Sequence, residues 1–239
     1  MYRPALALLL LATPAHAEVA LAAVAANFAA AAQELAEGFQ RETGHEVQVT
    51  VGSTGKLYAQ ISQGAPFDLL LSADAATPAK LQAEGHGTAT PYAFGVLTLW
   101  APGAAGTTPA LVLQDEATRH IAIANPDLAP YGVAAKAALI KMGLFDAIAD
   151  KIVMGQNIGQ TFALVQSGAA EAGFIAKSAL AADATGYIWD VSTELYPPIQ
   201  QDAIVLKHGS TNKAALGFLG YLASDAGRAV IAKFGYGLP

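Results

Sequence analysis

The feature that most constrains the fold of this chain is a repeated alternation between short apolar runs and helical patterns. Residues 19–26 are continuously apolar, as in a strand that is buried on both faces. Apolar residues at helical spacing follow over 27–44, and residues 47–51 then alternate between Val and polar residues. A further apolar run occupies 67–71 after another short helical pattern. Strands and helices that alternate at such intervals form βαβ units, so the sequence predicts an α/β fold with largely parallel sheets.

Length and composition limit the classes of protein to consider. The 239 residues suit one large α/β domain or two lobes of about 100 residues each. Apolar residues make up 54% of the chain and charged residues 13%, which excludes a disordered chain. The formal net charge of −6 argues against a nucleic-acid partner, because such proteins carry a basic excess. The absence of Cys excludes a thiol nucleophile, a disulfide framework and a Cys-ligated metal.

The first 17 residues have the pattern of a secretory signal peptide. Arg3 gives a positive start, residues 5–12 are an apolar run, and Ala15-His16-Ala17 is a small-x-small cleavage signature. The run is too short to span a bilayer, which takes about 20 residues. The alternative is a short buried N-terminal helix. We therefore expect residues 1–17 to be a signal peptide and the mature protein to be soluble and exported, in a bacterium to the periplasm.

The same local event recurs at four places: an apolar strand ends in small or polar residues, and a helix starts soon after. Backbone N–H groups at a helix N-terminus are unpaired and carry partial positive charge, which makes them ready anion sites. Ligands of open α/β sheets bind beyond the carboxyl ends of the strands, where several such N-termini could meet. The alternative is that these polar residues only cap their own helices. The four places are Ala26-Asn27, Ser53-Thr54, Pro130-Tyr131 and Asn157-Ile158.

Two sequence blocks near the N-terminus carry a family resemblance. The first is Ala22-Ala23-Val24-Ala25-Ala26-Asn27-Phe28, and the second is Gly52-Ser53-Thr54-Gly55-Lys56-Leu57-Tyr58-Ala59-Gln60-Ile61. Together they resemble the periplasmic molybdate-binding proteins of ABC transporters. The resemblance covers essentially the whole chain after the signal peptide. Its further blocks are Gly64-Ala65-Pro66-Phe67-Asp68, Leu71-Ser72-Ala73-Asp74, Ala124-Asn125-Pro126, Pro130-Tyr131-Gly132 and Ala232-Lys233-Phe234-Gly235-Tyr236.

The resemblance implies a type II periplasmic binding protein fold of the α/β class. Such a fold has two Rossmann-like lobes joined by two crossing strands, with the ligand between the lobes. We expect the first lobe to contain residues 18–98 and 206–239 and the second lobe to contain residues 99–205. The strands at 94–100 and 203–206 are the expected crossings.

The resemblance also implies the site. In that family a tetrahedral oxyanion is held by hydroxyls, amides and backbone N–H groups, with no bound metal and no direct counter-charge. Some relatives have a Tyr where this chain has Ala176, so a role for that position is not expected here and Tyr131 becomes more important. Carried over residue by residue, the expected ligand-binding residues are Ala26, Asn27, Ser53, Thr54, Tyr131 and, through its backbone, Ile158.

The function implied by the resemblance is binding of molybdate or tungstate and delivery to the membrane permease of an ABC importer. It implies no enzymatic activity, cofactor or nucleic-acid partner, and a monomer is the expected state for this class. A binder of sulfate, phosphate or ferric ion, an exported enzyme and a sensor are the alternatives. The chain has no consecutive Tyr pair, which weighs against iron, and no G-x-S-x-G motif, which weighs against a hydrolase.

Charged side chains near these motifs are expected to be bystanders. Lys56 follows the second block closely but is expected to be solvated, and Asp74 is expected to bond loop backbone. Asp68 lies within a predicted strand, and we expect no catalytic role for either aspartate. Four histidines are scattered without the spacing of a metal motif, and we expect them on the surface or in loops: His45, His86, His120 and His208.

Overall fold

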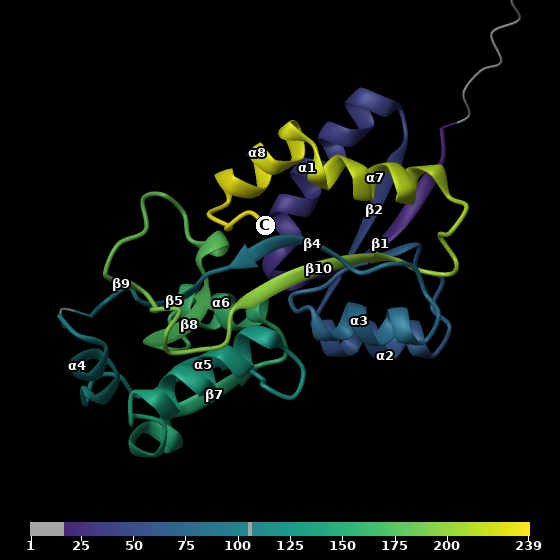
Figure 1. Cartoon of the computed structure of the whole chain (residues 1–239). Helices are drawn as coiled ribbons and strands as arrows, with labels where there is room; N and C mark the ends of the chain where they lie inside the picture. The colour runs from purple at the N-terminus through teal and green to yellow at the C-terminus, as the bar shows by residue number, and fades with distance from the viewer. Residues whose placement is uncertain (1–16, 105–106) are drawn as a thin grey trace, which may run out of the picture.

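The computed structural model describes residues 17–104 and 107–239, and it contains two five-stranded sheets. The predicted signal peptide lies outside the described residues except for Ala17. Within the described part of the chain, every helix is too short or too polar to cross a membrane. Each sheet is covered by helices, so the prediction of two α/β lobes is confirmed (Figure 1).

The first sheet has the strand order β2-β1-β3-β10-β4. Strands β1, β2 and β3 are parallel, and β10 is antiparallel to both of its neighbours. Helices α1, α7 and α8 lie on one face of the sheet, and α2 and α3 lie on the other (Figure 1). The strands are β1 (Val19–Ala25), β2 (Glu46–Gly52), β3 (Leu69–Leu71), β4 (Thr90–Gly95) and β10 (Ile199–Val205). The helices are α1 (Ala29–Thr43), α2 (Thr54–Ser62), α3 (Ala76–Ala83), α7 (Lys213–Ala223) and α8 (Asp225–Lys233).

Strand β1 is buried on both faces, as its continuous apolar run predicts. Ala22 and Val24 pack into the cluster that contains residues of α1, α7 and α8. Ala23, which points to the opposite face, packs with Leu57 and Ile61 of α2. The apolar run therefore follows from a central position in the sheet.

The second sheet has the strand order β7-β6-β8-β5-β9. Helix α5 packs in the larger apolar cluster of this lobe, and α6 packs on the other face against Ala122 and Ile175. The strands are β5 (Leu97–Ala101), β6 (Ile121–Ala124), β7 (Ile152–Gly155), β8 (Ala172–Ala176) and β9 (Tyr187–Asp190). The helices are α4 (Pro109–Gln114), α5 (Pro130–Lys141) and α6 (Ile158–Gln166).

The first crossing between the lobes falls within the predicted segment 94–100, but the second lies earlier in the chain than the sequence predicted. The first crossing is at Val96, because β4 belongs to the first sheet and β5, from Leu97, belongs to the second. The expected boundary at 98/99 is therefore slightly late. The boundary at 205/206 is wrong, because β10 pairs with β3 and β4 in the first sheet. The second crossing lies between β9 and β10, where Pro197-Pro198 occurs, and residues 203–206 are not a crossing.

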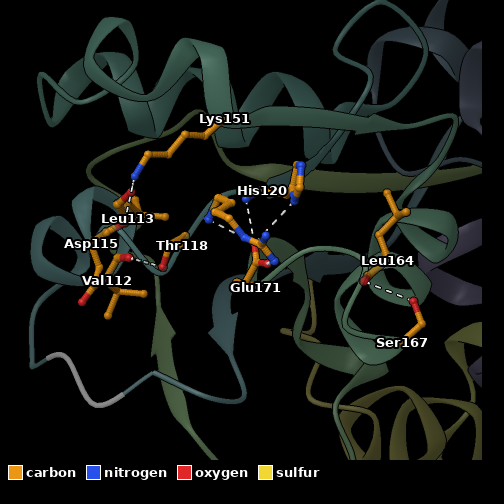
Figure 2. Close-up of polar contacts among 10 residues, drawn as sticks. Val112, Leu113, Asp115, Thr118, His120, Lys151, Leu164, Ser167 and Glu171 are labelled. Atoms are coloured by element: carbon orange, nitrogen blue, oxygen red, sulfur yellow. Dashed lines mark hydrogen bonds and ion pairs between the residues drawn. The ribbon is translucent and has the colours of Figure 1, made fainter.

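Glu171 joins the starts of two neighbouring strands in the second lobe (Figure 2). Its Oε2 accepts hydrogen bonds from the backbone N–H groups of His120 (2.7 Å) and Arg119 (3.1 Å), just before β6 begins. The Arg119 guanidinium also donates to its Oε1 at 3.3 Å. Burial alone would raise the pKa of Glu171, but these hydrogen bonds outweigh it and hold the pKa below its ordinary value.

Replacing Glu171 with Gln is expected to lower the free energy of unfolding at pH 7 by roughly 1 kcal/mol, because neutral acceptors form weaker hydrogen bonds than carboxylates. Because the pKa of Glu171 is lowered in the folded state, its carboxylate contributes fully to the free energy of unfolding above the unfolded-state pKa of about 4.3. This contribution is lost as the pH falls below that value. Urea unfolding of both proteins over this pH range measures the difference. Glu116→Gln, at an exposed glutamate nearby, is the control. A difference that stays constant down to the lowest pH would contradict the assignment.

Candidate functional site

The six residues that the sequence predicted for ligand binding lie around one small cavity between the two lobes. Its volume is about 10 Å³. All of the lining residues have uncharged side chains. They are Ala25, Ala26, Asn27, Ser53, Thr54 and Ala73 from the first lobe, and Ala129, Pro130, Tyr131, Asn157 and Ile158 from the second.

Two hydroxyls come from the start of α2, directly after β2. Ser53 precedes the helix, and its Oγ accepts a hydrogen bond from the N–H of Lys56 at 3.4 Å. Thr54 is the first helical residue, and its Oγ1 accepts from the N–H of Ala73 at 3.1 Å. Both side chains are almost fully buried. Because each oxygen already accepts from the backbone, the hydroxyl proton is the part of each group that remains for a ligand.

The Asn27 side chain does not cap a helix, although the position of Asn27 before α1 suggested that it is the N-cap of that helix. It lies inside a 3₁₀ turn, Ala26–Phe28, that separates β1 from α1. Its Nδ2 donates to Gln201 Oε1 (2.9 Å) and to Tyr236 Oη (3.1 Å). Its Oδ1 is buried and has no hydrogen-bond partner among the described residues. The amide of Asn27 is therefore part of a polar network and does not cap the start of α1.

Tyr131 brings a third hydroxyl, from the second lobe. It is the second residue of α5, after Pro130, a residue that suits the first position of a helix. Its side chain is 1% exposed, and its Oη accepts from Gln201 Nε2 at 3.5 Å. Burial, with added repulsion from Tyr236 and Tyr196, raises the pKa of Tyr131 well above its ordinary value. The phenol therefore keeps its proton at neutral pH and can donate it.

The start of α6 adds backbone N–H groups to the donors around the cavity. Asn157 caps this helix, with its Oδ1 accepting from the N–H of Gln160 at 2.9 Å. For the Asn157 side chain, the alternative is therefore correct: this residue caps its own helix. Ile158 is the first helical residue, so its N–H has no acceptor within the helix. The positive end of α6 thus lies at the cavity.

Direct contacts join the lobes on both sides of this cavity. The N–H of Gly55, in the first turn of α2, donates to the carbonyl oxygen of Leu128 in the second lobe at 3.0 Å. Ser178, in the 3₁₀ turn after β8, donates from Oγ to the carbonyl oxygen of Asn27 at 3.0 Å. Tyr236 Oη, which belongs to the first lobe, lies 2.9 Å from the same Ser178 Oγ. The lobes are therefore closed on the cavity.

The residues expected to be bystanders lie away from the cavity. Lys56 is exposed and is not part of the lining. Asp68 is buried and accepts from the N–H of Leu21 (2.7 Å), and its other oxygen lies 2.9 Å from His208 Nδ1. Asp74 accepts from the N–H of Thr77 at 2.8 Å, so it bonds loop backbone as expected. Ala176 is buried in the core of the second lobe.

Larger hollows occur elsewhere, but their linings do not have the same chemistry. One of about 450 Å³ opens beside the cavity and reaches Pro197-Pro198. Another of about 640 Å³ lies in the second lobe, near Asp115 and Glu171. The acidic side chains in these linings disfavour an anion, whereas the small cavity has unpaired donors from both lobes. Among the described residues, no group of three or more His, Asp or Glu side chains could hold a metal ion.

The geometry defines a class of protein, a two-lobed binding protein that encloses a small solute. Residues 20–237 match the family model described as bacterial extracellular solute-binding protein. The chain belongs to this family.

Its relatives include molybdate-binding proteins. The chain is 44% identical to the molybdate-binding protein ModA of Azotobacter vinelandii, over 96% of this chain and 94% of that protein. It is 40% identical to ModA of Rhodobacter capsulatus, over 97% and 94% of the two chains. The solved structure of the Azotobacter vinelandii periplasmic molybdate-binding protein superposes with a TM-score of 0.86, at 35% identity, over 94% of this chain and all of that one. The resemblance found in the sequence and the type II fold that it implied are confirmed.

Proposed function

We propose that this protein binds molybdate, or the similar ion tungstate, in the periplasm and delivers it to the membrane permease of an ABC importer. The observation that carries the proposal is the cavity between the lobes, whose lining brings together three hydroxyls and a helix N-terminus without a charged side chain. The names of the relatives support molybdate as the ligand. We propose a binding role with no catalysis and no cofactor, carried out by the monomer without nucleic acid.

The donor set suits a dianion that carries no proton. Ser53, Thr54 and Tyr131 each have the oxygen engaged and the proton available. Hydrogen bonds to a charged group are worth about 1.5–3 kcal/mol each, so several offset much of the cost of removing the ion from water. An ion too small to reach every donor leaves some unsatisfied, at about 1–3 kcal/mol each. The small volume of the cavity argues against a large organic solute, whose sites are usually hundreds of Å³.

Thermal unfolding with a panel of oxyanions tests the ligand. Molybdate and tungstate at about 100 times their Kd are expected to stabilise the protein by about 2.7 kcal/mol, which is a rise in Tm of roughly 5–10 °C. Sulfate, phosphate and chromate at the same concentrations are expected to give smaller shifts. Sulfate that binds as tightly as molybdate in calorimetry would contradict the proposal and favour the alternative, a sulfate-binding protein. Delivery is tested by capture on the permease, which we expect to require the bound ion.

A further inference from the structure

We propose that Gln201 is a positioning residue for the ligand, one that orients Asn27 of the first lobe and Tyr131 of the second. This inference rests on the proposed function and deepens it. Gln201 lies in β10 and does not line the cavity. It is 0% exposed, yet it is hydrogen-bonded to a lining side chain from each lobe.

The contacts of Gln201 fix the direction of its amide. Its Oε1 accepts from Asn27 Nδ2 at 2.9 Å. Tyr92 Oη, which lies 2.9 Å from Oε1 and 2.9 Å from the carbonyl oxygen of Ser72, shares its proton between these two acceptors. With the oxygen engaged on this side, Nε2 faces Tyr131 Oη at 3.5 Å. Each end of the amide therefore has a defined role.

Backbone features place the Gln201 side chain in this position. The pairing of β10 with β4 shifts register between Gln201 and Asp202, which is an irregularity that redirects side chains. Gly95, at the end of β4, leaves the space. A Cβ atom there would lie 2.3 Å from Tyr131 Oη and 2.7 Å from Gln201 Nε2. The glycine at the first crossing thus allows Gln201 and Tyr131 to meet.

The consequence concerns the proton of Tyr131. Nε2 of Gln201 donates to Tyr131 Oη, so the phenol is the acceptor of this hydrogen bond. The phenol therefore does not donate its own proton to Gln201 and can donate it to the oxyanion. The same glutamine holds the amide of Asn27 in the other lobe. Tyr131 and Gln201 belong to different lobes, so their contact joins the lobes beside the first crossing. Gln201 therefore links the orientation of the donors from one lobe to that from the other.

Gln201→Met keeps the length of the side chain and removes its hydrogen bonds. We expect the Kd for molybdate, measured by calorimetry, to rise about ten- to fiftyfold, on the scale of one or two charge-assisted hydrogen bonds. Gln200→Met is the matched control: Gln200 is the neighbouring residue in β10, and its Nε2 donates to Asp202 instead. The Kd of this control is expected to stay within about twofold of the wild-type value, as for substitutions away from key contacts.

A double-mutant cycle with Tyr131→Phe separates positioning from a general loss of structure. If Gln201 acts through the phenol, adding Gln201→Met to Tyr131→Phe raises Kd much less than it does in the wild-type protein. The ultraviolet difference spectrum on adding molybdate gives a second readout. The tyrosine signal that disappears in Tyr131→Phe is expected to be reduced in Gln201→Met. Multiplicative effects on Kd with an unchanged spectrum would overturn the inference.

The outcomes also distinguish this inference from the proposed function. If the wild-type protein binds no molybdate, both are wrong. If the wild-type protein binds it and Gln201→Met binds it equally well, only the positioning role is wrong. Should Gln201→Met fail to fold, Tyr92→Phe is the milder variant, because it removes one hydroxyl that contacts Gln201 Oε1 and keeps the ring. It is expected to raise Kd about two- to fivefold, and no change would overturn the inference.

Discussion

Replacing Asn27 with Asp is expected to abolish molybdate binding while the lobes remain folded. The side chain is 7% exposed and lines the cavity, so a carboxylate at this position would face the ion with little water between them. Two unit charges 4 Å apart interact with about 4 kcal/mol at an effective dielectric constant of 20, and the ion has two charges. Repulsion on this scale raises Kd at least about a thousandfold. Calorimetry with molybdate measures the loss.

The control for this variant adds the same charge elsewhere. Asn212→Asp lies at the start of α7, where the side-chain oxygen caps the helix by accepting from Ala214 and Ala215. Aspartate can keep those hydrogen bonds but loses the one that Asn212 Nδ2 donates to the carbonyl oxygen of Val19 at 2.8 Å. The control is therefore expected to fold with a small loss of stability and to bind molybdate with a Kd near the wild-type value. Circular dichroism establishes that both variants are folded. An Asn27→Asp protein that binds molybdate within about tenfold of wild type would show that Asn27 is not beside the ion.

The family resemblance predicted that Asn27, Thr54 and Tyr131 meet at one site, and a local rule explains why the sequence allows it. In each lobe, apolar runs mark parallel strands whose carboxyl ends lie at one edge of the sheet, and the helix that follows begins there. The rule places the starts of α2 and α6 at the cavity without knowledge of side-chain contacts. The role of each side chain is less predictable. Asn27 and Asn157 both precede helices, but Asn157 caps its helix and Asn27 does not.

The polar network behind the cavity could not be predicted because it joins residues far apart in the chain. Asn27 contacts residues 174 and 209 positions later, Gln201 and Tyr236. The glutamine stands next to Gln200 and Asp202 in β10, and this run of polar residues has no spacing that indicates the partners of each side chain. Tyr236 belongs to the closing block that resembles the family, but that resemblance indicates no partner for its hydroxyl.

The position of β10 in the first sheet also could not be predicted from the sequence. Its apolar residues, including Ala203 and Ile204, predict a strand but do not indicate which sheet the strand joins. Antiparallel pairing with both β3 and β4 decides this, and it is a tertiary property. The second crossing lies instead before β10, where Pro197-Pro198 occurs.

Replacing Gly132 with Ala is expected to destabilise the protein, although helix propensity predicts the opposite. Gly132 is the third residue of α5, where Ala would ordinarily stabilise by up to about 1 kcal/mol. However, a Cβ atom at this position would lie 2.2 Å from the carbonyl oxygen of Ala124 and 2.8 Å from the nitrogen of Pro126. Both are backbone atoms, at the end of β6 and just after it, so they cannot move aside as a side chain can. The helix must move instead, and overpacking on this scale costs about 3 kcal/mol.

The movement of α5 links this stability loss to binding, because Tyr131 is the residue before Gly132. We expect Tm to fall by roughly 6–12 °C in thermal unfolding, and the Kd for molybdate to rise at least about tenfold as the phenol leaves its position beside Gln201. Gly220→Ala in α7 is the matched control, since a Cβ there meets nothing within 4 Å. It is expected to leave Tm unchanged or slightly raised. If Gly132→Ala behaves like Gly220→Ala, α5 does not pack on β6 closely enough to hold Tyr131 at the cavity.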